Sequence, residues 1–170
     1  MKIEFEISDD ASFLGLINTD QYNSFVDENW EFEQVKERII NESNKGHLLF
    51  WGTDIPNFWT VRICDQPIAK EAFKSFEGKI KVTNSRLYLI NYESLTLAAQ
   101  FEEEQLPEEH LADLYVKLQN AVYNVTIRQL FDPEKGEIED ILGFEIVLQK
   151  SKTKNSKTLN SFNELIWSEY

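Results

Sequence analysis

The sequence predicts a mainly β fold: an antiparallel β-sandwich or partly open barrel with one amphipathic helix and a short C-terminal helix. Two observations predict it. Short apolar and aromatic runs recur between turn residues, and only one segment has a clear helical period. The regular alternation of strands and helices that is typical of a parallel sheet does not occur. The chain has 170 residues, which is the length of one domain.

The first strand is predicted at residues 2–8, where three apolar side chains alternate with polar ones: Ile3, Phe5 and Ile7. Residues 9–29 have no such period, and we expect only a short helical turn around Tyr22 and Phe25. The helix is predicted at residues 30–43, where five side chains share one face: Trp30, Phe32, Val35, Ile39 and Ile40. Asn29 suits its N-cap and Gly46 its end. Its polar side is mainly acidic, so we expect it to pack on a sheet rather than on a membrane.

The remaining elements are predicted as strands. Residues 47–53 and 58–64 flank a turn at Pro56 and are predicted to form a hairpin. Further strands are predicted at 76–82, 86–92, 95–101, 122–131 and 144–148, with a tight turn at 83–85. The apolar faces of these elements place six side chains in the core: Phe5, Trp30, Phe50, Leu89, Leu97 and Ile127. Alternation leaves open which aromatic residues beside Pro56 reach the surface: Trp51, Phe58 or Trp59.

We interpret residues 1–150 as a single β-rich domain. Residues 151–158, SKTKNSKT, contain no apolar side chain and are basic, which indicates a surface linker. Residues 159–170 are predicted to form a closing helix because four apolar side chains have helical spacing: Leu159, Phe162, Leu165 and Ile166.

The chain is strongly acidic, with 30 Asp and Glu against 17 Lys and Arg and a formal net charge of −13. Such a charge repels phosphate backbones and anionic lipid headgroups, so we expect neither nucleic acid nor membrane as a partner. The charge serves solubility, or it forms a surface for a basic protein; the composition leaves both open.

The N-terminal residues MKIEFEISDD lack the apolar stretch and cleavage site of a signal peptide. Nowhere does an apolar run approach the ~18 residues of a membrane span. The single Cys cannot form an intrachain disulfide, which fits a reducing compartment. We therefore expect a cytoplasmic protein.

Residues suited to catalysis are scarce. Cys64 is the only Cys, and the two His, His47 and His110, are far apart in sequence. Cys64 is expected to be a small buried side chain, because no His spacing indicates a general base for it. The sequence contains no P-loop, no G-x-G-x-x-G motif and no EF-hand loop. We expect no enzyme activity, no catalytic residue, no cofactor and no metal.

The densest charge lies in residues 101–110, FEEEQLPEEH, with Asp113 close behind. Carboxylates at this density repel one another, so this segment forms a solvated loop or a recognition surface. As a recognition surface it supplies six candidate contact residues: Glu102, Glu103, Glu104, Glu108, Glu109 and Asp113.

From Trp30 to about Glu134 the sequence resembles the competence protein J family, small bacterial inhibitors of a DNA-entry nuclease. The resemblance rests on Trp30 opening a helix, Gly46 before a strand, VRI at 61–63, the run AFKSFEGKIKVTNSRLYLINY at 72–92, and LQNAVY at 118–123. Gln119 and Ala121 stand where the family's turn has Pro and Gly. The resemblance implies a β-rich inhibitor or immunity-type protein that blocks a basic enzyme, and it assigns no site residue.

Together these features favour an acidic protein-binding module that inhibits a basic nuclease or toxin. The alternative is a β-sandwich domain that binds a ligand or acts as a scaffold, with its charge serving only solubility. Charge gathered on one face would favour the first hypothesis, and evenly spread charge beside an aromatic pocket would favour the second.

Overall fold

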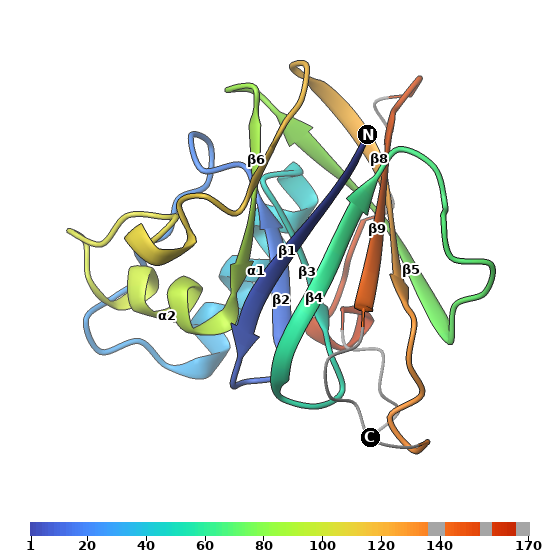
Figure 1. Cartoon of the computed structure of the whole chain (residues 1–170). Helices are drawn as coiled ribbons and strands as arrows, with labels where there is room; N and C mark the ends of the chain where they lie inside the picture. Colours follow the sequence, from blue (N-terminus) through green and yellow to red (C-terminus); the bar gives the residue numbers. More distant parts are fainter. Residues whose placement is uncertain (136–141, 154–157, 166–170) are drawn as a thin grey trace.

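The computed structural model describes residues 1–135, 142–153 and 158–165. Two β-sheets face each other, and helices cover the outer side of the smaller one (Figure 1). The five-stranded sheet has the order β1-β4-β9-β8-β5 and the four-stranded sheet the order β3-β2-β6-β7. The strands are β1 Lys2–Asp9, β2 Phe13–Ile17, β3 Leu48–Gly52, β4 Asn57–Cys64, β5 Lys74–Val82, β6 Arg86–Asn91, β7 Tyr115–Lys117, β8 Ala121–Gln129 and β9 Leu142–Lys150. The helices are α1 Phe32–Lys45 and α2 Tyr92–Gln100, with 3-10 turns η1 Glu109–Leu111 and η2 Phe162–Glu164.

This architecture confirms the predicted mainly β, sandwich-like fold. All pairings are antiparallel except that of β4 with β9. The predicted strand at residues 2–8 is β1, which pairs with β4 along its whole length. The predicted helix is α1; it begins at Phe32, with Glu31 as N-cap in place of Asn29. It ends at Gly46, whose φ of 77° is the left-handed conformation that glycine adopts readily.

The hairpin predicted for residues 47–64 is wrong. Both strands exist, but β3 pairs with β2 in the smaller sheet, whereas β4 pairs with β1 and β9 in the larger one. The turn between them therefore carries the chain from one sheet to the other. Thr53 begins this crossing: its N–H donates to the carbonyl of Ser12 at 2.9 Å, and its hydroxyl donates to the buried carboxylate of Asp9 at 2.5 Å.

Residues 9–29 contain a strand, β2, and a turn at 19–21 in which the N–H of Tyr22 donates to the carbonyl of Asn18 at 3.0 Å; no such turn is found at Phe25. The sequence of β2, FLGLI, does not alternate because this strand has apolar layers on both sides. Leu14 and Leu16 face the core between the sheets, and Ile17 faces the core beneath the helices.

The strand predicted at residues 95–101 is also wrong, because residues 92–100 form α2. Asn91 caps this helix: its side chain accepts a hydrogen bond from the Ser94 N–H at 3.1 Å and donates one to the carbonyl of Ser8, also at 3.1 Å. The cap therefore fixes both the start of α2 and its position against β1.

The apolar core has two layers. Between the sheets lie Ile7, Leu14, Trp51, Trp59, Val61, Leu89, Ile127 and Phe144, among others. Between the smaller sheet and the helices lie Val35, Ile39, Phe50, Leu95 and Phe162, among others. Of the six predicted core side chains, Phe50, Leu89 and Ile127 are fully buried, and the others, Phe5, Trp30 and Leu97, are half-buried. Trp51 and Trp59 are fully buried, whereas Phe58 is 59% exposed.

The C-terminal part of the chain returns to the helical layer. Phe162 on η2 packs against Phe13 and Phe50, with ring centroids 5.8 and 6.4 Å apart. Residues 154–157 of the predicted linker and 166–170 of the predicted closing helix lie outside the described residues.

Candidate protein-binding surface

The six predicted contact residues lie on residues 101–114, the loop that joins α2 to β7 (Figure 1). Two leucines fix its path. Leu111 is 4% exposed in the core between the sheets, and Leu106 packs against the core beneath the helices. Backbone hydrogen bonds from the Glu104 N–H to the Phe101 carbonyl and from the Leu111 N–H to the Glu108 carbonyl close local turns. The intervening carboxylates are thus presented on a loop anchored at two points.

The six carboxylates are not equivalent. Four are exposed (Glu102, Glu103, Glu109 and Asp113), and two are half-buried (Glu104 and Glu108). The carboxylate of Glu108 accepts a hydrogen bond from the hydroxyl of Ser94 on α2. Glu108 therefore holds the loop against the helix, while the other five form no ion pair with any described residue.

A second acidic segment, which the sequence analysis missed, lies against the same helix. The N–H groups of Val26 and Asp27 both donate to the carbonyl of Ala99, at 2.8 and 3.2 Å. The side chain of Gln100 donates to the carbonyl of Glu28 at 3.2 Å. These bonds bring the exposed side chains of Asp27 and Glu28 to the C-terminal end of α2, where the acidic loop begins.

We call the eight carboxylates of these two segments the acidic face: Asp27, Glu28, Glu102, Glu103, Glu104, Glu108, Glu109 and Asp113. Residues 18–31 and 92–114, which carry it, contain no Lys or Arg. These two segments therefore carry charge of one sign, and a cation of α1, Arg38, lies against the first of them, where it donates to the carbonyl of Asn23 at 2.9 Å.

An exposed aromatic residue and a hollow lie beside the carboxylates of the acidic face. Phe101, which precedes the three consecutive glutamates, is 38% exposed. The shallow hollow has a volume of about 460 Å³ and is lined by Glu104, Gln105, Pro107, Glu108, Glu109 and His110. An exposed aromatic ring amid charged groups is a frequent anchor of protein interfaces.

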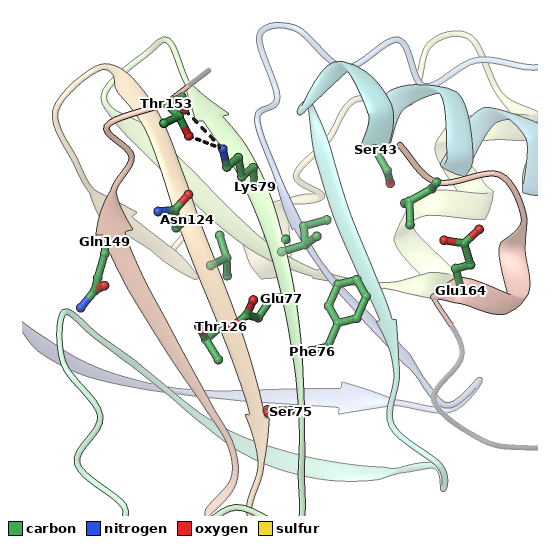
Figure 2. A pocket seen from close by; sticks show the side chains of 14 residues that line it. Ser43, Ser75, Phe76, Glu77, Lys79, Asn124, Thr126, Gln149, Thr153 and Glu164 are labelled. Atoms are coloured by element: carbon green, nitrogen blue, oxygen red, sulfur yellow. Dashed lines mark hydrogen bonds between the residues drawn. The ribbon is translucent and has the colours of Figure 1, made fainter. Parts of the chain in front are cut away.

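A larger groove of about 770 Å³ runs beside β5 and is lined by residues of α1, β3, β5, β8, β9 and the segment before η2 (Figure 2). Its lining mixes hydroxyl and amide side chains with three charged ones, Glu77, Lys79 and Glu164, and four apolar ones, Leu49, Phe76, Val125 and Leu159. The ammonium of Lys79 donates to the hydroxyl of Thr153 at 2.9 Å, which closes one end of the groove. Neither His nor Cys is among the described residues of its lining.

The buried carboxylate of Glu145 has a structural role. It accepts hydrogen bonds from the guanidinium groups of Arg62 and Arg128 and from the N–H groups of Ile68 and Ala69. Burial opposes its ionisation, but these four donors outweigh burial and lower the pKa of Glu145. Glu145 therefore fastens the loop between β4 and β5 to the outer face of the larger sheet.

The carboxylate of Glu93, in the first turn of α2, has the opposite environment. Its two oxygens are buried, and neither makes a hydrogen bond of ordinary geometry with a described residue. Burial is the largest effect and raises the pKa of Glu93; backbone N–H groups lower it in part, and the nearby carboxylates of Asp9 and Asp10 raise it further. Ionised Glu93 therefore destabilises the folded protein.

Replacing Glu93 by Gln is expected to stabilise the protein at neutral pH, because the substitution removes a charge whose oxygens are buried; solvent screening around this half-buried side chain limits the gain to ~1 kcal/mol at most. A raised pKa in the folded state makes the wild type lose stability as the pH rises above 4.5, the ordinary pKa of the group. The two proteins should therefore converge in stability below that pH. Urea denaturation at several pH values measures the difference, and a destabilised E93Q at neutral pH would contradict it.

The other residues singled out by their chemistry have local roles. Cys64 is fully buried, as expected, and burial raises the pKa of its thiol. The His47 Nδ1 atom lies 2.8 Å from a carboxylate oxygen of Glu42 at the end of α1. His110 lies on η1, at the edge of the acidic face. Among the described residues, no three His, Cys, Asp or Glu side chains are placed to hold a metal ion, and no helix could cross a membrane.

Comparison with known proteins finds a similar fold among solved structures. No protein-family model and no curated protein matches the sequence. Among solved structures, the chain is similar to the protein described as crocagin biosynthetic gene J, with a TM-score of 0.55 and 13% identity over 89% of this chain and 96% of the other. This similarity shows a shared fold. ComJ from Bacillus subtilis, an inhibitor of the DNA-degrading activity of NucA, is a weaker structural neighbour, with a TM-score of 0.49 and 10% identity over 86% of this chain and 92% of ComJ.

Proposed function

We propose that this protein is a non-enzymatic binding module whose acidic face neutralises a basic protein, either a nuclease or a toxin. One observation carries the proposal: eight carboxylates gather on two segments that meet along α2 and contain no Lys or Arg. Complementary charge speeds protein association and selects among partners. A protein that binds phosphate groups of nucleic acid has the complementary positive surface.

The form of the acidic face supports the same role. The loop is anchored through Leu106 and Leu111, so less conformational entropy is lost on binding than with a flexible acidic tail. Phe101 provides an apolar contact next to Glu102, and such contacts supply most of the binding energy of a protein interface. The sequence resemblance to the competence protein J family suggests a nuclease as the partner.

The experiment begins with immobilised protein and an extract of the source cell at low salt. We expect a basic protein to be retained and to be released by salt, and we expect its DNA-degrading activity to be blocked by the added chain. In the variant E102Q/E103Q/E104Q/E109Q, the association rate with this protein at low salt should fall by roughly tenfold or more, because electrostatic steering is lost. Stopped-flow measurements over a range of salt concentrations test this.

The control variant E6Q/E71Q/E77Q/E134Q removes the same number of charges from exposed positions outside the acidic face. It should retain most of the association rate and of the inhibition. If the two variants behave alike, net charge rather than the acidic face controls binding, and the alternative of a ligand-binding or scaffold domain gains support. If the retained proteins do not degrade DNA, a nuclease partner is contradicted.

A further inference from the structure

A second charged surface, of opposite sign, lies at one end of the two sheets. Five strands meet there: the C-terminal ends of β5, β7 and β9 and the N-terminal ends of β6 and β8 (Figure 1, top). The strand register fixes this arrangement. Arg86 on β6 pairs with Lys117 on β7, and Tyr123 on β8 pairs with Lys150 on β9.

Along the chain, the charges at this end are separated from the acidic ones. Residues 79–90, 114–131 and 146–153 contain no Asp or Glu. We define the cationic end by the five exposed Lys and Arg side chains that these segments place there: Lys81, Arg86, Lys117, Lys150 and Lys152. The net charge of −13 is therefore the sum over surfaces of opposite sign.

The cationic end lacks internal neutralisation. None of its five cations forms an ion pair with a described residue. Arg86 instead lies over the ring of Tyr115, 4.8 Å from its centroid, and the ammonium of Lys150 lies 3.4 Å from the side-chain oxygen of Gln119. Like charges held directly opposite on paired strands, as in Arg86 and Lys117, repel each other. A bound anion would relieve this repulsion.

The surroundings of these cations indicate which anion fits. A hollow of about 710 Å³ lies here, lined by Asn84, Ser85, Arg86, Lys117, Leu118 and Gln119. Amide, hydroxyl and cationic side chains of this kind make most contacts to nucleic-acid phosphates. The exposed large apolar side chains of the described residues all lie outside these segments. A protein interface or an inserted membrane contact needs such side chains, whereas phosphate contacts do not.

We propose that the cationic end binds the phosphate backbone of a nucleic acid. The net charge of the whole chain led us to expect no nucleic-acid partner. However, charges on a protein surface are screened beyond about 10 Å at moderate salt, so a phosphate group interacts mainly with the charges close to it. The nearest exposed charges therefore matter most at this end: they are the five cations, with two carboxylates at the margin, Asp20, which accepts a hydrogen bond from Thr83, and Asp65, which pairs with the N-terminal ammonium. Binding should be weak, insensitive to base sequence and steeply dependent on salt. This proposal does not depend on the proposed function of the acidic face.

The test is the fluorescence anisotropy of short labelled DNA, single-stranded and duplex, titrated with the full chain from low to moderate salt. The wild type should bind at low salt. The variant K81Q/R86Q/K117Q/K150Q should bind at least ~10-fold more weakly, with a smaller salt slope, because each lost phosphate contact lowers that slope by about 0.7 to 0.9. The variant K36Q/R38Q/K70Q/K135Q removes the same charge elsewhere and should stay within about 2-fold of the wild type.

Circular dichroism and urea midpoints establish that both variants remain folded. Absence of DNA binding by the wild type at low salt would overturn the proposal. Equal losses in the two variants would overturn it too, because they would make net charge the cause. Tighter binding of the cationic end to polyglutamate, or to vesicles of phosphatidylcholine and phosphatidylserine, would also overturn it by indicating a different class of partner.

Discussion

Replacing Glu145 by Gln is expected to lower the free energy of unfolding by about 3 to 5 kcal/mol, the usual cost of removing one partner from a buried ion pair. Glu145 is fully buried, and Arg62 and Arg128 are nearly so, with 15% and 12% of their side chains exposed. The amide of Gln has no charge and one acceptor oxygen in place of two. Two guanidinium groups and the N–H groups of Ile68 and Ala69 would therefore compete for it.

The same substitution should change the response to acid. Because the folded protein lowers the pKa of Glu145, the ionised group contributes its full stability above pH 4.5, its ordinary pKa, and this contribution is lost as the pH falls through the lowered value. The wild type should therefore lose stability on acidification more steeply than E145Q. Urea denaturation between neutral and acidic pH measures both slopes.

Glu4 provides a matched control, since its carboxylate binds the same guanidinium as Glu145. It lies 2.9 Å from the Arg62 Nε atom, but its side chain is 42% exposed. Solvent screening makes exposed ion pairs weak, so E4Q should lose far less stability than E145Q. Hydrogen exchange at the Ile68 and Ala69 N–H groups should accelerate only in E145Q. Equal losses in the two variants would contradict a special role for the buried carboxylate.

Seven of the nine strands could be predicted from the sequence because apolar runs and alternation mark them directly. The other two lack such a signal: β2 is apolar on both faces, and β7 has only three residues. A strand was predicted at residues 95–101, where Leu95, Leu97 and Ala99 alternate with other side chains, but α2 covers this segment up to Gln100. In the helix, burial instead follows Leu95, Ala98 and Ala99. The assignment of β3 and β4 to different sheets depends on long-range pairing, which no local pattern encodes.

The candidate surfaces were predictable only where their residues are close in sequence. The loop with Glu102 to Asp113 is one short segment, so its charge could be recognised directly. Asp27 and Glu28 join it through hydrogen bonds to the end of α2, and this element was predicted as a strand. The cationic end combines single charges from separate strands. Only the order and register of the sheets bring them together.

Replacing Phe50 by Ala is expected to cost about 3 to 5 kcal/mol, the range for removing a large buried aromatic side chain. Phe50 is fully buried on β3, and its ring lies 5.1 Å from that of Phe13, 6.3 Å from that of Tyr92 and 6.4 Å from that of Phe162. These neighbours belong to β2, α2 and η2. The cavity would thus weaken the attachment of the helical layer to the smaller sheet at one point shared by all three elements.

Trp30→Ala distinguishes burial from side-chain size as the cause of this loss. Trp30 is larger than Phe50 and was also predicted for the core, but it precedes α1 and is only half-buried. Since the cost follows the apolar area removed from water and the cavity left behind, W30A should lose less stability than F50A. Urea denaturation midpoints, compared at unchanged m-values, give the loss in the free energy of unfolding for each variant. A larger loss in W30A would mean that the segment before α1, rather than the ring cluster around Phe50, holds the helices to the sheet.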